Sequence, residues 1–213
     1  ASKLKVKTET IEITKQLIEE FKWVEEEDKE AVAYHEAGHA LVRLLLPEHA
    51  DPLYKLTIIP RGGALGVTHW LPEREKYLHS KDEFITQIMS AMGGRIAEEI
   101  AFNVVSSGAS DDFSKATDIA QQMVRFYGMS DKLGHVTYSP DSHYTSSART
   151  NELIDQEVRT IIEECYQKAK ELLLNNRDKL DKLAKAVLER ETIVAEEAYE
   201  LLGITPRTNH TIR

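Results

Sequence analysis

Residues 31–41 read AVAYHEAGHAL and contain a His-Glu-x-x-His motif formed by His35, Glu36 and His39. The surrounding sequence predicts a helix over about 28–46, because the next residue is a proline, which cannot continue a helix. A helix turns about 100° per residue, so the two histidines lie one turn apart on the same face. Two imidazoles in this arrangement can bind one tetrahedral Zn²⁺, and the glutamate beside them can accept a proton from water. The spacing is therefore typical of zinc-dependent amide hydrolysis.

The alternative is a helix that carries two unrelated surface histidines. The neighbours of the motif argue against it, because most are apolar: Val32, Ala37, Ala40, Leu41, Leu44 and Leu45. Histidines that are partly buried among such residues need hydrogen-bonding or metal partners. The sequence context therefore favours a metal site.

The composition narrows the class of protein. The 213 residues are 41% hydrophobic and carry a formal net charge of −9, which argues against nucleic acid or an anionic membrane surface as the main partner. Cys165 is the one cysteine, so no intramolecular disulfide can form, as suits a reducing compartment. No apolar run approaches the roughly 20 residues that span a bilayer, and no signal peptide is visible. We expect a soluble, folded chain.

Two segments flank the motif helix. Residues 1–27 are highly charged and have apolar residues at helical spacing around 13–21, which predicts a short amphipathic helix in a linker. After the motif, residues 53–59 and 64–70 predict two strands joined by a turn at 61–63. This hairpin either covers the core or holds an extended peptide along its edge, and the sequence leaves both open.

The rest of the chain predicts helices. Ser80 and Glu83 form a capping box that opens a helix to about Phe102. Its Gly93-Gly94 pair costs about 1 kcal/mol per residue relative to alanine, which favours close backbone contact with Ala37-Gly38. Ser110 is expected to cap a helix that ends near Gly128.

Residues 129–150 predict an irregular connection, and 151–203 a helical pattern with three apolar stripes. The expected fold is mainly α, with a small β-hairpin and a C-terminal helical bundle.

A catalytic zinc site normally has three protein ligands and an open position for water. The sequence places none of the remaining candidate histidines at the short downstream spacing of the extended zinc motif: His69, His79, His135 and His143. Two acidic pairs are better candidates. Glu98-Glu99 lies within a helix, whereas Asp111-Asp112 lies at a helix start, where the helix dipole favours an ionised carboxylate. These arguments leave both pairs open.

Five motifs follow one another in order: Val32–Ala40, Ile59–Thr68, Gly93–Glu99, Ser107–Asp112 and Tyr127–Gly134. This succession closely resembles the peptidase domain of the FtsH family of membrane-bound, ATP-dependent zinc proteases, over about residues 28–203. The connections at 102–105 and 138–148 are shorter than is usual in that family.

The resemblance implies a site for one Zn²⁺ per chain. Its ligands would be His35, His39 and Asp112, and Glu36 would take the proton of a zinc-activated water. Either Glu98 or Glu99 would hydrogen-bond a ligating imidazole and fix its tautomer.

The resemblance also implies an upstream AAA-type ATPase domain and transmembrane helices. This chain has no Gly-x-x-x-x-Gly-Lys-Ser/Thr motif, so ATP would act only through that other domain. We therefore expect a linker at 1–27, a peptidase domain at 28–203 and a tail at 204–213. Implied partners are polypeptide substrates and further copies in a homo-hexamer. The membrane would be reached only through the absent helices, with this domain on the cytoplasmic side.

Other classes of protein remain as alternatives. One is a non-catalytic helical assembly module with a structural zinc, and another is a metallopeptidase of a different clan with Glu98 or Glu99 as the third ligand. A peptide deformylase-like hydrolase also uses the His-Glu-x-x-His motif. It needs a cysteine ligand ahead of the motif, whereas Cys165 lies far after it.

Overall fold

The computed structural model describes residues 26–60, 65–71, 77–139 and 146–206. The amphipathic helix predicted around residues 13–21 and the turn predicted at 61–63 lie outside this part of the chain.

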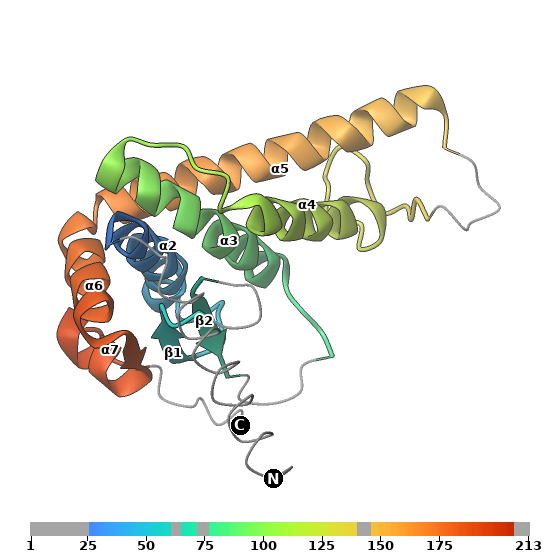
Figure 1. Ribbon diagram of the computed structural model, residues 1–213. Coiled ribbons are helices and arrows are strands. Elements are labelled where there is room, and N and C mark those ends of the chain that lie inside the picture. The colour runs from blue at the N-terminus through green and yellow to red at the C-terminus, as the bar shows by residue number, and fades with distance from the viewer. Residues whose placement is uncertain (1–25, 61–64, 72–76, 140–145, 207–213) are drawn as a thin grey trace, which may run out of the picture.

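The fold is mainly α-helical, as the sequence predicts (Figure 1). The described residues form the helices α2 (Glu26–Leu45), α3 (Lys81–Phe102), α4 (Ser110–Arg125), α5 (Ala148–Leu174), α6 (Arg177–Arg190) and α7 (Ala195–Leu202). A small sheet contains β1 (Leu53–Thr57), β2 (Val67–Trp70) and β3 (Thr192–Val194).

Helix α2, which carries the motif, is the centre of the fold. It packs along α3 on one side and against α6 on another, and it also contacts β1. Ala33, Ala37, Ala40 and Leu41 are fully buried at these contacts. The long α5 lies against α3 and α4 along the upper side of the molecule in Figure 1. Among the C-terminal helices, α5 therefore packs chiefly on α3 and α4, α6 packs on α2, and α7 packs on α6 and the sheet.

The close approach predicted between the small residues of α2 and α3 is confirmed. A Cβ atom added to Gly38 would lie 2.2 Å from the carbonyl oxygen of Gly93, and one added to Gly93 would lie 2.6 Å from that of Gly38. Because no side chain fits between the two backbones, α3 lies as near to the motif as a helix can.

The sheet has one strand more than the sequence predicts. The β1–β2 hairpin is present, but β3 pairs antiparallel with β1 on its other side, giving the order β2-β1-β3. The prediction of continuous helix over 151–203 is wrong at this point. Glu191 ends α6 with φ of 59°, and the β-branched residues that follow favour extended backbone. Ile193 of β3 is fully buried.

The helix starts differ in how well they follow the prediction. Ser80 caps α3, and its capping box with Glu83 is present. The cap predicted at Ser110 is wrong, because Ser110 is already the first residue of α4 and Ala109 occupies the cap position without a side-chain hydrogen bond. Ser147 caps α5, so that helix begins before the predicted Asn151.

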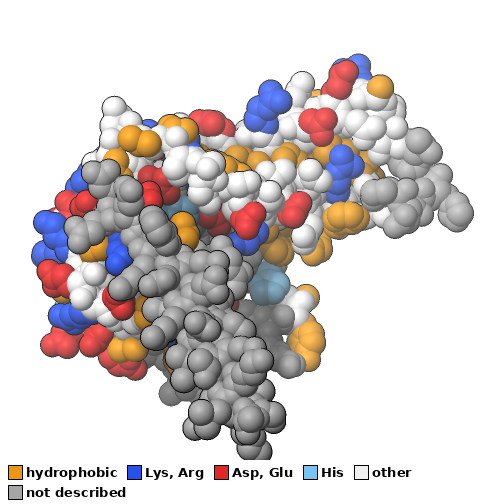
Figure 2. Space-filling model, viewed as in Figure 1, with side chains coloured by type: hydrophobic (Ala, Val, Ile, Leu, Met, Phe, Trp, Pro, Cys, Tyr) orange, Lys and Arg blue, Asp and Glu red, His pale blue; other side chains and the backbone are white. Residues whose placement is uncertain are grey.

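Charged side chains of both signs are interspersed over the helices on the face shown in Figure 2. No described helix is both long and apolar enough to cross a lipid bilayer.

Candidate metal centre

Helix α2 presents His35 and His39 on one face, with ring centroids 4.5 Å apart and ring planes at 86°. The first turn of α4 brings Asp112 to them. Its Oδ2 atom lies 3.2 Å from Nε2 of His35 and 3.3 Å from Nε2 of His39. Donor atoms of the three residues all lie within 4.8 Å of one another. Among the described residues, no second cluster of His, Cys, Asp or Glu meets that geometry.

This cluster fits a zinc ion by its chemistry and its spacing. Two imidazole nitrogens and a carboxylate oxygen are a donor set that zinc prefers. Two ligand atoms at usual zinc distances and tetrahedral angles lie about 3.3 Å apart, close to the separations between Asp112 and each ring. The three side chains are 14–17% exposed, so the cluster is open to solvent on one side.

The ring nitrogens that face away from Asp112 are each hydrogen-bonded. Nδ1 of His35 lies 2.6 Å from Oε1 of Glu98, and Nδ1 of His39 lies 2.7 Å from the main-chain oxygen of Ser90. Because a carbonyl oxygen only accepts, Nδ1 of His39 donates this hydrogen bond, and Nε2 is the ring nitrogen that faces Asp112. Glu98 in turn accepts a hydrogen bond of 2.6 Å from the Ser106 hydroxyl. These contacts fix the tautomer and the orientation of the rings.

Glu98 and Glu99, which the sequence could not separate, have different surroundings. Glu98 contacts His35 on the side of the ring away from Asp112, so it supports the imidazole without sharing a metal position with it. The carboxylate of Glu99 instead bonds Arg95, Tyr166 and Lys170. Glu99 therefore lies outside the histidine cluster and ties α3 to α5. Of the two glutamates proposed for contact with an imidazole, Glu98 is the one that makes it.

The cluster strongly perturbs the ionisation of its members. Burial lowers the pKa of His35, but hydrogen bonds to Asp112 and Glu98 and the nearby charge of Glu36 raise it to about 9. Burial raises the pKa of Asp112, but hydrogen bonds from both histidines hold it well below its usual range. Asp112 is therefore ionised at every physiological pH, as a metal ligand must be. Asp112 lies in the first turn of α4, where the helix dipole also stabilises its negative charge.

Glu36 points out of α2 beside the cluster and is only 6% exposed. Its Oε2 atom accepts a hydrogen bond of 2.6 Å from the hydroxyl of Thr68 on β2. Glu36 follows His35 in the sequence, and its negative charge helps to raise the pKa of that histidine. A buried carboxylate beside a histidine pair is suited to proton exchange with a water molecule at the cluster.

The other candidate histidines lie apart from this cluster. His69 is exposed on β2, and His135 is exposed after α4. The ring of His79 lies 3.7 Å from a carboxylate oxygen of Glu83 at the start of α3. His143 lies outside the described residues.

Sequence reasoning missed four contributors to the site. Thr68 and Gly94 fall inside motifs that carry the family resemblance, but their spacing gives no sign of what they touch. A Cβ atom added to Gly94 would lie 2.6 Å from the ring of His35. Ser106 lies in a loop whose composition predicts only a turn. Ser90 contacts His39 through its main-chain oxygen, and a main-chain contact cannot be recognised from residue types in the sequence.

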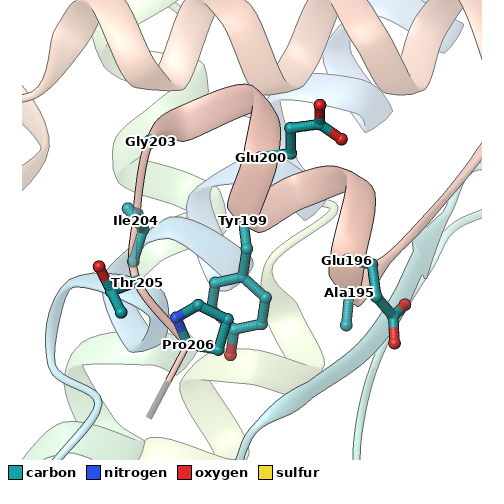
Figure 3. A pocket seen from close by; sticks show the side chains of 8 residues that line it. All are labelled: Ala195, Glu196, Tyr199, Glu200, Gly203, Ile204, Thr205 and Pro206. Atoms are coloured by element: carbon teal, nitrogen blue, oxygen red, sulfur yellow. The ribbon is translucent and has the colours of Figure 1, made fainter. Parts of the chain in front are cut away.

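A cavity among the described residues lies away from this cluster. It measures about 560 Å³ and is lined by residues of α7 and the segment after it (Figure 3). Its largest side chain is Tyr199, and none of the metal-centre residues lines it. The cavity is therefore separate from the histidine cluster on α2.

The sequence of this chain matches a known protein family. The profile of peptidase family M41 matches residues 22–201. A protein of Cupriavidus metallidurans named ATP-dependent zinc metalloprotease FtsH is 46% identical over 190 residues, which cover 85% of this chain and 29% of that protein. A protein of the same name from Thermobaculum terrenum is 45% identical over 194 residues, covering 85% of this chain and 30% of its own length. The chain thus spans about three tenths of the length of these curated relatives.

Proposed function

The chain belongs to peptidase family M41, and from that premise we propose that it is the zinc-dependent endopeptidase domain of an ATP-dependent protease. It hydrolyses peptide bonds of unfolded polypeptides. The observation that carries this proposal is the meeting of His35, His39 and Asp112 beside the buried carboxylate of Glu36.

The metal ligands in this proposal are Nε2 of His35, Nε2 of His39 and a carboxylate oxygen of Asp112. A zinc ion bound there supplies a Lewis acid that polarises the scissile carbonyl and lowers the pKa of water. Glu98, Ser90 and the dipole of α4 hold the three ligands in place. The partial exposure of the cluster leaves room for water and substrate.

Glu36 is the general base and then the general acid. Its carboxylate takes a proton from the attacking water and passes it to the leaving amine nitrogen. Burial suits the group to this task, because a carboxylate shielded from bulk solvent exchanges its proton with the reacting groups rather than with the medium.

The decisive variant is Glu36→Gln, which keeps the shape of the side chain and removes its basicity. We expect it to bind zinc as the unmodified chain does and to lose cleavage of a fluorescently labelled unfolded polypeptide by at least about 100-fold. Elemental analysis and the cleavage rate are measured on the same preparations. Cleavage retained by Glu36→Gln would remove Glu36 from this role and leave the proposal without its base.

A structural zinc in a non-catalytic assembly module is the second candidate function. It requires a fourth protein ligand, and the described residues supply only three donors to the cluster. The exposed side of the site favours the catalytic assignment.

We propose the domain organisation, assembly and location of the complete protein from its relatives. The relatives are named ATP-dependent, which supports an ATPase domain elsewhere in the protein. We propose residues 1–27 as a linker, 28–203 as the peptidase domain and 204–213 as a tail. Assembly is as a homo-hexamer, with the complete protein in the cell or inner membrane and this domain on the cytoplasmic side.

A further inference from the structure

Thr68 contacts Glu36 from a different element of the fold. It lies on β2, at the edge of the sheet, while Glu36 lies on α2. Its Oγ1 atom is 2.6 Å from Oε2 of Glu36 and 3.2 Å from the main-chain oxygen of the same residue. A hydroxyl has a single proton to donate, and the shorter distance is that of a charge-assisted hydrogen bond to a carboxylate.

Gly66, which precedes β2, packs closely against the side chain of Glu36. A Cβ atom added to Gly66 would lie 2.7 Å from Cγ and 2.9 Å from Oε1 of Glu36. The side chain of Glu36 is thus confined by the backbone at Gly66 and bonded by the hydroxyl at Thr68. Only the absence of a side chain at Gly66 leaves room for this packing.

We propose that Thr68 is a positioning residue for the reaction, which acts by holding Oε2 of Glu36 so that Oε1 is the atom that exchanges the proton. This inference rests on the proposed function of Glu36. A glutamate side chain has three rotatable bonds, and a misplacement of about 1 Å can cost a reaction about 100-fold. A fixed hydroxyl from a strand removes that freedom before the substrate arrives.

A purely structural role for Thr68 is the competing explanation, since the same hydrogen bond joins β2 to α2. The two roles make different predictions for Thr68→Val, which keeps the size and β-branching of the side chain and removes only the hydroxyl. Either role can lower the stability of the fold, so kcat separates them: a purely structural role leaves kcat unchanged, whereas a positioning role lowers kcat and leaves KM unchanged.

The test compares Thr68→Val, Thr68→Ser and Thr57→Val on the zinc-loaded chain with a fluorogenic peptide. Thr57 is the matched control, because its buried hydroxyl on β1 bonds Glu191 and Thr192 rather than Glu36. We expect Thr68→Val to lower kcat at least about tenfold with KM and zinc content unchanged. Thr68→Ser restores most of the rate. Thr57→Val lowers the melting temperature without lowering kcat.

A second measurement does not depend on turnover. The urea midpoint of unfolding is compared for Thr68→Val in the native background and in a Glu36→Ala background. If the hydroxyl acts on Glu36, the substitution lowers the midpoint in the first background and has little effect in the second. Equal shifts in both backgrounds overturn the inference.

The outcomes separate this inference from the function on which it rests. If Glu36→Gln still cleaves, the proposed function fails. If Glu36→Gln is inactive while Thr68→Val has the unmodified kcat, the proposed function stands and the positioning role of Thr68 fails.

Discussion

Asp112 owes its position in the site to where it lies on α4. It is in the first turn, where unpaired amide groups and the helix dipole stabilise a negative charge. Its Oδ2 atom also lies within 3.3 Å of Nε2 of both His35 and His39. Neither Glu98 nor Glu99 combines these features, because each lies in the interior of α3. The sequence alone left the two acidic pairs open, since the choice depends on which helix start meets α2 in space.

The ionisation of His35 leads to a pH-dependent stability in the metal-free chain. Its pKa is raised to about 9 in the folded chain, against an unperturbed value of about 6.5. A raised pKa contributes stability that is fully present below about pH 6.5 and is lost as the pH rises through about 9. We expect the urea midpoint of the metal-free chain to fall across this range. A His35→Gln control should lose that fall, and a midpoint that stays level or rises in the unmodified chain would contradict the ion pair.

At the scale of elements, the contact between α2 and α3 decides whether the site forms. Gly38 and Gly93 let the two backbones touch, and Gly94 admits the ring of His35. The sequence predicts the first contact, because a Gly-Gly pair inside a helix is costly unless another backbone approaches it. It does not predict the second, since nothing in the pattern says which ring lies opposite.

Gly94→Ala tests this contact. The added Cβ would lie 2.6 Å from the ring of His35, so the ring must move away from the position where it meets Asp112. We expect zinc affinity to fall about 10–100-fold, as measured by competition with a chelator, although alanine is the better helix former. Gly108→Ala is the matched control, because its Cβ would meet only the Ser106 hydroxyl at 3.4 Å. An unchanged zinc affinity in Gly94→Ala would contradict this prediction, because it would show that the ring of His35 tolerates the added Cβ.

Local signals predict most elements, and long-range pairing accounts for the rest. The capping box at Ser80 and the apolar spacing of the helices are local, and both predictions are confirmed. The strand β3 is three residues long and exists because β1 offers it an edge, which no local pattern reveals. The contact between Thr68 and Glu36 belongs to the same class, since it joins a strand to a helix 32 positions away.

At the scale of the whole molecule, the site is assembled from four elements, with α2 at its centre. That helix supplies His35, Glu36 and His39, while α4 supplies Asp112, α3 supplies Glu98, and β2 supplies Thr68. The sequence predicts the residues of α2 from spacing alone. The other three depend on how the helices and the sheet pack, which is why the family resemblance was needed to choose Asp112.

The central claim is that His35, His39 and Asp112 bind zinc. The most direct test is bound zinc per chain by elemental analysis, for the unmodified chain, Asp112→Ala and Glu99→Ala. It needs neither a substrate nor an ATPase. We predict that Asp112→Ala loses the metal and Glu99→Ala largely keeps it, because Glu99 bonds Arg95, Tyr166 and Lys170 instead of the histidines. Loss of zinc from Glu99→Ala with retention in Asp112→Ala would contradict the ligand set.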